Sequence, residues 1–185
     1  YPKLTGHSEE APPLTIGPHT PQPYVAGSIF NISGMSFGAL SGPAVRALSQ
    51  GAALAGCWLN TGEGGLSDYH LEGGSDIVFQ IGTAKYGVRN EAGNLDEEKL
   101  AAIAARAEVK MFEIKLSQGA KPGKGGILPA AKVTAEIAMV RGIPEGRDSL
   151  SPNRHPEVEN NGELLDFIDA VRRLSGKPTG FKTVI

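Results

Sequence analysis

Short strands that alternate with helices predict a parallel α/β fold. Four short segments read as strands, at residues 28–33, 57–60, 110–116 and 181–185, and segments with helical periodicity lie between them. Such alternation is typical of βα units, because the connection between two parallel strands has to cross back over the sheet. Four units can form an open doubly wound sheet or half of an eight-stranded barrel, and the periodicity alone leaves both open.

The composition is that of a globular chain. Of the 185 residues, 40% are hydrophobic and 21% are charged, which is enough for one good core. The formal net charge of −2 gives no sign of a nucleic-acid or membrane-surface role. The single cysteine, Cys57, excludes an internal disulfide and fits a reducing, cytoplasmic setting. The four histidines show no metal-ligand spacing, so we predict no metal site in these residues.

The first 27 residues differ from the rest of the chain. They contain six prolines, which are incompatible with a helix interior or a central strand. We therefore predict an extended arm over residues 1–27 and a folded domain over residues 28–185. The chain begins at Tyr1 and ends inside the apolar run 181–185, so we expect it to be part of a longer protein.

The first predicted helix follows the strand at residues 28–33. Ser41 and Pro43 mark its start, since proline is favoured at the first helical position. Gly56 can end it in a left-handed conformation. Its predicted inward face consists of Val45, Leu48, Ala52 and Ala55. The strand at 57–60 comes next, and we place the extended run 76–81 in an excursion after that strand.

The clearest helix is predicted over residues 94–107. Asn94 and Glu97 resemble a capping box at its start. One face of this helix is apolar and comprises Leu100, Ile103, Ala104 and Ala107. The strand at 110–116 follows directly.

The last third of the chain predicts two helices and a strand. A helix over residues 132–141 is followed by a loop rich in proline and asparagine at 142–162. A second helix covers 163–175, with Leu164, Leu165, Ile168 and Val171 facing inward. The strand at 181–185 ends the pattern.

Three glycine-rich segments each follow a predicted strand. They are GMSFGALS (34–41), NTGEGG (60–65) and QGAKPGKGG (118–126). Ligands of α/β folds bind at the carboxyl ends of parallel strands, and glycines there let backbone amides approach a flat ring or an anion. The segments are neither a dinucleotide fingerprint, which would need glycine at Ser67, nor a P-loop, which would need Ser or Thr after Lys124. They predict the shared floor of one binding site.

Together these motifs resemble the FMN-binding domain of the glutamate synthase large subunit. The three segments occur in the order of that family, and GTAKYGV (82–88) and the closing Phe181 and Lys182 also fit. The resemblance runs from about residue 29 to residue 185. It implies a parallel (β/α)8 barrel of the TIM type, of which this chain supplies the first half, about four βα units. It also implies FMN as cofactor and the reductive amination of 2-oxoglutarate to L-glutamate through an imine.

The resemblance assigns roles to nine positions. It makes Glu63 and Lys121 catalytic, and Gln118, Lys121 and Arg141 substrate-binding. It places the flavin ring against Gly34, Met35 and Ser36, close to Asn60, with Lys182 at its pyrimidine edge. Taken alone, most of these residues are ordinary loop or helix-end residues, although a lysine between apolar strand residues is unusual in a plain core.

The chemistry of these residue types suits the implied reaction. An arginine such as Arg141 can hold a carboxylate through two parallel hydrogen bonds, and Lys121 can contact the other carboxylate or the keto oxygen. A cation such as Lys182 beside the ring would stabilise the anionic reduced flavin. Glu63 could relay a proton to or from the imine nitrogen.

The chain also departs from the large synthases. It has no amidotransferase domain, none of the family's iron–sulfur cysteines and none of the phosphate-binding loops expected late in such barrels. Its loop at 149–159, with SPNRHP at 151–156, is unlike theirs. Two alternatives therefore stay open: another FMN barrel oxidoreductase acting on a related oxo acid or amine, and a non-catalytic flavin- or metabolite-binding module.

These departures also set expectations for the chain by itself. We expect it to be inactive, to hold no FMN and to self-associate, because half a barrel leaves two unpaired strand edges. A longer protein would bind a 2-oxoglutarate-like substrate and an electron donor, and it could carry an iron–sulfur cluster that this segment does not ligate.

Overall fold

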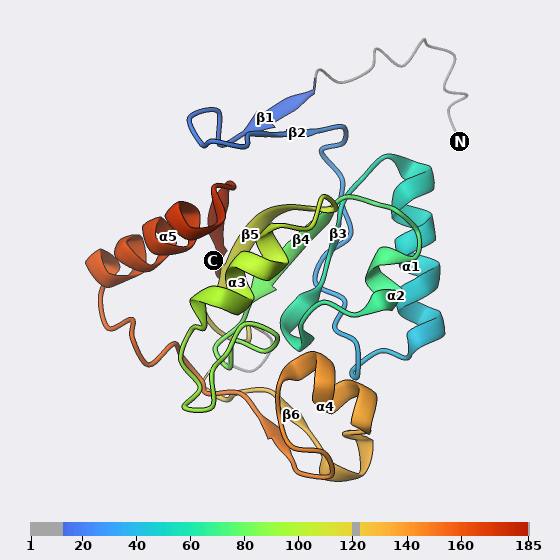
Figure 1. Cartoon of the computed structure of the whole chain (residues 1–185), viewed down its shortest axis with the longest axis vertical. Helices are drawn as coiled ribbons and strands as arrows, with labels where there is room; N and C mark the ends of the chain where they lie inside the picture. The colour runs from blue at the N-terminus through green and yellow to red at the C-terminus, as the bar shows by residue number, and fades with distance from the viewer. Residues whose placement is uncertain (1–12, 120–122, 185) are drawn as a thin grey trace.

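The centre of the molecule is a four-stranded parallel sheet (Figure 1). The computed structural model describes residues 13–119 and 123–184. The strands lie in the order β3 (Leu59–Asn60), β4 (Ile77–Ile81), β5 (Val109–Lys115) and β8 (Thr179–Lys182). This order follows the chain with no reversal, as along one arc of a barrel, whereas a doubly wound sheet reverses its order at a switch point.

The central position of β4 contradicts the prediction that residues 76–81 lie in an excursion. Ile77–Ile81 pairs with β3 on one side and β5 on the other, and all five of its residues are buried. The crossover from β3 to β4 holds only two short helices, η1 (Gly62–Gly64) and α2 (Asp68–Leu71). No amphipathic helix of ordinary length marks this crossover in the sequence, which is why the run did not look like the next strand.

The first predicted strand, at residues 28–33, is reduced to a single isolated bridge between Ile32 and Leu59. Backbone hydrogen bonds nevertheless align the segment with β3. The amide of Ile32 donates to the Trp58 carbonyl at 3.1 Å, and the amide of Asn60 donates to the Ile32 carbonyl at 3.0 Å. The loop at residues 34–41, which follows this segment, therefore begins at the carboxyl end of β3.

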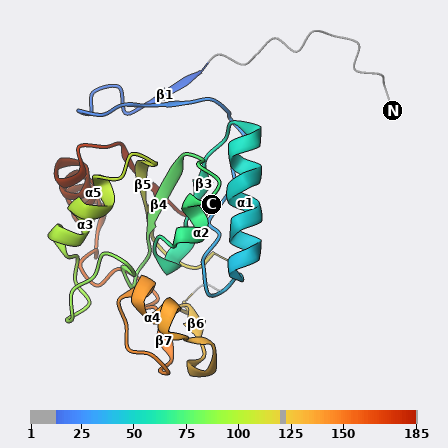
Figure 2. The ribbon, with the colours of Figure 1, turned by 45° about the vertical axis from the view of Figure 1, so that its right-hand side comes forward.

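Helices α1 (Gly42–Ala55), α3 (Glu97–Ala104) and α5 (Asn161–Ser175) pack on the strands and share one core with them; α1 lies next to β3, and α5 lies next to β5 and β8 (Figure 2). The predicted ends of α1 are confirmed. Its N-cap is Ser41, and Gly56 ends it with a φ of 62°.

The predicted cap of α3 is wrong. Its N-cap is Asp96, whose side chain accepts a hydrogen bond from the Lys99 amide at 3.1 Å, and not Asn94. Asn94 instead donates its amide to the Asn90 side chain in the turn before the helix. Both residues are good caps, so the sequence pattern could not choose between them.

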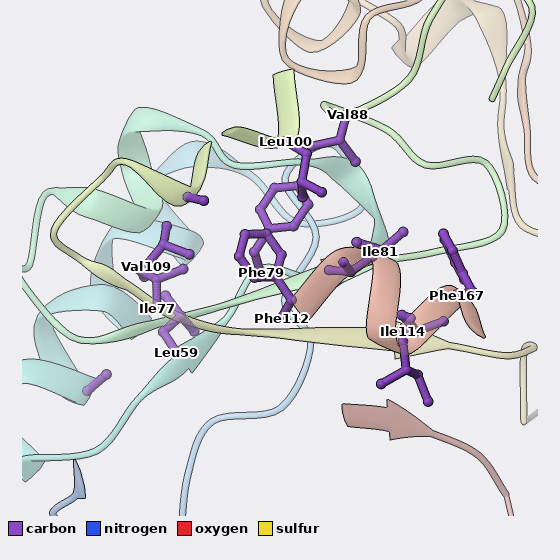
Figure 3. Packing of buried hydrophobic residues seen from close by; sticks show 14 residues of the cluster. Leu59, Ile77, Phe79, Ile81, Val88, Leu100, Val109, Phe112, Ile114 and Phe167 are labelled. Carbon is purple, nitrogen blue, oxygen red and sulfur yellow. The ribbon is translucent and has the colours of Figure 1, made fainter. Parts of the chain in front are cut away.

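The core lies on the helix side of the sheet (Figure 3). The rings of Phe79 and Phe112 meet there, with centroids 5.7 Å apart. Along β5, Phe112 and Ile114 are buried in this core, while the alternate residues Glu113 and Lys115 are only partly buried. Since successive side chains of a strand point to opposite faces, the other face of the sheet is polar towards its carboxyl end.

An insertion between β5 and α5 lies at one end of the molecule (Figures 1 and 2). It contains β6 (Ile127–Leu128), η2 (Ala130–Lys132), α4 (Ala135–Arg141) and β7 (Ser149–Leu150), and β6 and β7 pair antiparallel. The helix predicted over 132–141 is thus a short 3-10 turn followed by α4.

The described part of the predicted arm, residues 13–27, forms an antiparallel pair at the opposite end of the molecule (Figures 1 and 2). Its strands are β1 (Leu14–Ile16) and β2 (Tyr24–Ala26), and neither joins the central sheet. Within the described residues, no helix has the length and apolar character needed to cross a membrane.

Candidate functional site

A cavity of about 410 Å³ opens at the carboxyl ends of the central strands. All three glycine-rich segments reach it, through Gly34, Ser36, Gly62, Glu63, Gln118 and Gly119. Gln80, Lys115 and Lys182 add polar groups from the strand ends. The volume lies in the usual range for small-molecule sites, and convergent polar groups on a strand-end floor are typical of them.

Glu63, in η1, is held by Gln118 from the third glycine-rich segment. The Gln118 Nε2 donates to Glu63 Oε2 at 2.6 Å, and Lys115 Nζ donates to Gln118 Oε1 at 3.0 Å. Because an ammonium group can only donate, Lys115 turns the Gln118 oxygen towards itself and leaves the amide nitrogen for Glu63. The predicted catalytic acid and substrate-binding glutamine are thus directly connected.

Lys182, at the end of β8, belongs to a second polar cluster. Its Nζ lies 2.8 Å from Glu113 Oε1 and donates to Gln80 Oε1 at 2.7 Å. The Asn60 amide also donates to Glu113 Oε1, at 2.8 Å. A second hollow of about 280 Å³ adjoins Asn60, Glu113 and Lys182, and of these three residues Lys182 also lines the first cavity. Gln80 is 2% exposed and its Nε2 has no partner among the described residues.

Only part of the loop that was predicted to face the flavin ring, Gly34 to Ser36, lines the cavity. Gly34 and Ser36 line the cavity, but the Met35 side chain packs against the main core. Asn60 fixes the loop from below: its carbonyl accepts the Met35 amide at 3.0 Å, and its Oδ1 accepts the Gly62 amide at 2.9 Å. Asn60 therefore holds two glycine-rich segments at once.

Arg141, at the end of α4, lies behind Ser36 rather than in the cavity wall. It is 3% exposed, and its guanidinium donates to Ser149 Oγ at 2.9 Å and to the Phe37 carbonyl at 3.2 Å. The guanidinium carbon stands 5.0 Å from the centre of the Tyr86 ring. Burial lowers the pKa of Arg141, and its Nε has no partner among the described residues.

The structure thus brings together Gly34, Ser36, Glu63, Gln118 and Lys182 around one cavity, with Asn60 beside it. It places the Met35 side chain and Arg141 just outside that space. Lys121 lies outside the described residues. Among the residues that are described, no group of three or more potential metal ligands occurs.

Sequence reasoning missed several polar residues of the site. Gln80, Glu113 and Lys115 all come from strands and complete the two polar clusters. A signal was present: Gln80 interrupts an otherwise apolar strand, and Glu113 and Lys115 alternate with Phe112 and Ile114. Alternation of this kind indicates one apolar and one polar face.

A second cavity of about 410 Å³ lies at the amino ends of β5 and β8, under the β1–β2 pair. Its wall is mostly apolar, with Ile16, Met111 and Pro178, and Arg172 is the charged side chain that reaches it. It lacks the convergent polar groups of the strand-end cavity, so we take the strand-end cavity as the candidate site.

Two buried histidines give the fold a pH dependence. His70 and His155 are 0% and 2% exposed, and burial lowers the pKa of both. In the unfolded chain they titrate near pH 6.5. As the pH falls below about 6.5, the two histidines therefore bind protons in the unfolded state but not in the folded state. The free energy of unfolding decreases until the pH reaches the lower pKa values of the folded state.

We expect the free energy of unfolding in urea to fall between pH 7.5 and pH 5, by up to about 1.4 kcal/mol per pH unit for each histidine. His70→Gln and His155→Gln should each flatten this slope. His19, which is exposed, provides the control, because His19→Gln should leave the slope unchanged. Equal slopes in all three variants would contradict the assignment.

Comparisons with known proteins agree with the motifs. The family model described as the conserved region in glutamate synthase matches residues 4–184. The chain is 46% identical over 171 residues to the glutamate synthase large subunit-like protein YerD of Bacillus subtilis, covering 91% of this chain and 32% of that protein. It is 38% identical over 152 residues to the archaeal glutamate synthase (NADPH) of Archaeoglobus fulgidus, covering 81% and 27%.

A third relative is the archaeal-type glutamate synthase (NADPH) of Dehalococcoides mccartyi, which is 36% identical over 140 residues. That match covers 76% of this chain and 25% of the relative. The chain therefore spans about a quarter to a third of the length of these relatives. With a family model that matches nearly its whole length, the chain belongs to the glutamate synthase family.

Proposed function

We propose that this chain forms the first half of the FMN-binding (β/α)8 barrel of a cytoplasmic oxidoreductase that reductively aminates 2-oxoglutarate to L-glutamate. The observation that carries the proposal is the cavity at the strand ends, where Glu63, Gln118 and Lys182 meet the glycine-rich loops. The sequential parallel strand order supports the half barrel. Membership of the glutamate synthase family supports the reaction.

The residues of the cavity fit a flavin ring. Gln80 offers a buried amide nitrogen without a partner, 2% exposed, beside the Lys182 ammonium. A donor and a cation side by side suit the acceptor-rich pyrimidine edge of FMN. Gly34 and Ser36 would flank the ring, with Asn60 beneath their loop. When bound, FMN would supply the hydride for the reduction.

The remaining residues suit the substrate. Glu63 would hold or move a proton at the nitrogen that becomes the amino group, with Gln118 fixing its orientation. Lys121 and Arg141 would bind the two carboxylates of the oxo acid. Arg141 lies behind Ser36, and its Nη2 is 3.5 Å from Ser36 Oγ. To contact Arg141 directly, the substrate would have to replace the groups that the guanidinium now binds, Ser149 and the Phe37 carbonyl.

One observation favours a related oxo acid or amine instead. The loop at 149–159, which differs from that of the large synthases, contacts Lys115 of the cavity wall, whose carbonyl lies 2.9 Å from His155 Nε2. Ser149 holds Arg141, and the Pro152 carbonyl accepts a hydrogen bond from Thr83 Oγ1 at 2.7 Å. A change of sequence in this loop can therefore change which oxo acid or amine the full-length protein accepts.

The decisive test is flavin reoxidation in the full-length protein. We expect photoreduced enzyme to be reoxidised anaerobically by 2-oxoglutarate plus ammonium, with glutamate as product. A panel of other oxo acids, each with ammonium, separates the two oxidoreductase functions. Bound flavin that no oxo acid reoxidises would point to a non-catalytic flavin-binding module.

We also expect the isolated chain to self-associate and to bind no FMN. Phe181 and Val184 are 52% and 63% exposed at the β8 edge, and Ile29 and Phe30 are 65% and 81% exposed near the β3 edge. Unpaired strand edges next to exposed apolar side chains favour association. Light scattering and visible absorbance with added FMN measure both properties. A yellow, stoichiometric monomer would show that half a barrel suffices.

A further inference from the structure

His70, in the short helix α2, is fully buried and bonded through both ring nitrogens. The Ser67 amide donates to Nδ1 at 3.1 Å. A backbone amide can only donate, so Nδ1 carries no proton and the proton of the neutral ring is on Nε2. Nε2 lies 2.8 Å from the Met35 carbonyl and therefore donates to it. The lowered pKa of His70, caused by burial, agrees with a neutral ring.

The Met35 backbone is consequently held at both ends. Its amide donates to the Asn60 carbonyl at 3.0 Å, and its carbonyl accepts the His70 proton. These two bonds fix the peptide planes on either side of Met35. The neighbours Gly34 and Ser36 line the cavity, so the direction of their backbone depends on these planes.

We propose that His70 is a positioning residue of the site, which fixes the loop of Gly34, Met35 and Ser36 in the conformation that receives the flavin ring. The inference rests on the proposed FMN function and extends it to a residue that never touches the ligand. Preorganised backbone raises affinity because less order has to be created on binding. The bond from Nε2 spans 35 residues of sequence, whereas the bond at Nδ1 serves only the first turn of α2.

Because Nδ1 and Nε2 of His70 bind different partners, two substitutions can separate a positioning role of His70 from a purely structural one. In His70→Gln the amide nitrogen can reach the place of Nε2 and still donate to Met35, but the bond from Ser67 is lost. In His70→Asn the amide oxygen can reach the place of Nδ1 and still accept from Ser67, but nothing reaches Met35. His70→Gln loses the contacts of Nδ1 with the Ser67 amide and hydroxyl, and His70→Asn loses the bond to Met35, so both should lower the melting temperature.

The test measures FMN affinity in the full-length protein by flavin fluorescence. We expect His70→Asn to raise the Kd about tenfold, equivalent to about 1.4 kcal/mol and to one hydrogen bond. His70→Gln should stay within about twofold of the parent. Equal weakening in both variants, in step with their melting temperatures, would overturn the proposal.

Amide hydrogen exchange in the same variants keeps the inference separate from the flavin function. The amides of Met35 and Leu40 are bonded to the Asn60 and Ser36 carbonyls on either side of the contact. They should exchange faster in His70→Asn than in His70→Gln. If the parent binds no FMN, the proposed function fails and this comparison alone decides on His70: unequal rates support its positioning role, and equal rates refute it.

Discussion

In the full-length protein, replacing Glu63 by glutamine is expected to lower kcat for the proposed reductive amination of 2-oxoglutarate roughly 10²–10⁴-fold, the range of general acid–base catalysis. Glu63 lines the cavity, and one carboxylate oxygen is fixed by Gln118 at 2.6 Å. The glutamine keeps the size of the side chain but cannot accept a proton. FMN content should be unchanged, because Glu63 is not among the residues that we assign to the ring.

A second variant tests whether the loss of any carboxylate, and not that of Glu63 in particular, lowers the activity. Glu91 is exposed in the loop before α3, and Glu91→Gln should retain the activity of the parent. Stopped-flow measurement of flavin reoxidation isolates the chemical step from reduction by the electron donor. A Glu63→Gln enzyme that is reoxidised at the parental rate would remove Glu63 from the catalytic machinery.

The local signals in the sequence predicted the helices better than the sheet. Ser41 and Gly56 bound α1 as expected, because a cap acts within one turn of its own helix. The role of β4 was missed, since whether an apolar run joins a sheet depends on partners that lie more than 30 residues away, such as Val109 for Ile77. The choice of Asp96 over Asn94 likewise depends on how the preceding turn closes.

The sequence pointed to the loop residues of the candidate site and to Lys182, but it missed the polar residues of strands β4 and β5. Motif resemblance pointed to Glu63, Gln118 and Lys182, which the structure brings to one cavity. Gln80 and Glu113 belong to no loop motif, and their contacts with Lys182 cross strand pairs. For Arg141 the resemblance predicted a role in substrate binding. The structure shows what the sequence could not, that the Arg141 guanidinium already donates hydrogen bonds to Ser149 and to the Phe37 carbonyl.

Replacing Gly62 by alanine is expected to lower the free energy of unfolding by roughly 2–5 kcal/mol. Gly62 has a φ of 66°, where a side chain costs about 1–2 kcal/mol. A Cβ there would also lie 2.7 Å from the Ser36 amide nitrogen and 3.0 Å from its Cα. Backbone cannot rotate away as a flexible side chain can, so overpacking adds roughly 1–3 kcal/mol.

Gly146 separates the two contributions to this loss. Its φ is also 66°, but a Cβ there would meet nothing within 4 Å. Gly146→Ala should therefore lose only the 1–2 kcal/mol of left-handed strain in urea unfolding. In Gly62→Ala the loop of Ser36 must also move away from that of Glu63, so flavin binding and activity should fall in this variant alone. Equal stability losses in the two variants would mean that Ser36 and Gly62 are not in close contact, and that the floor of the site is built differently.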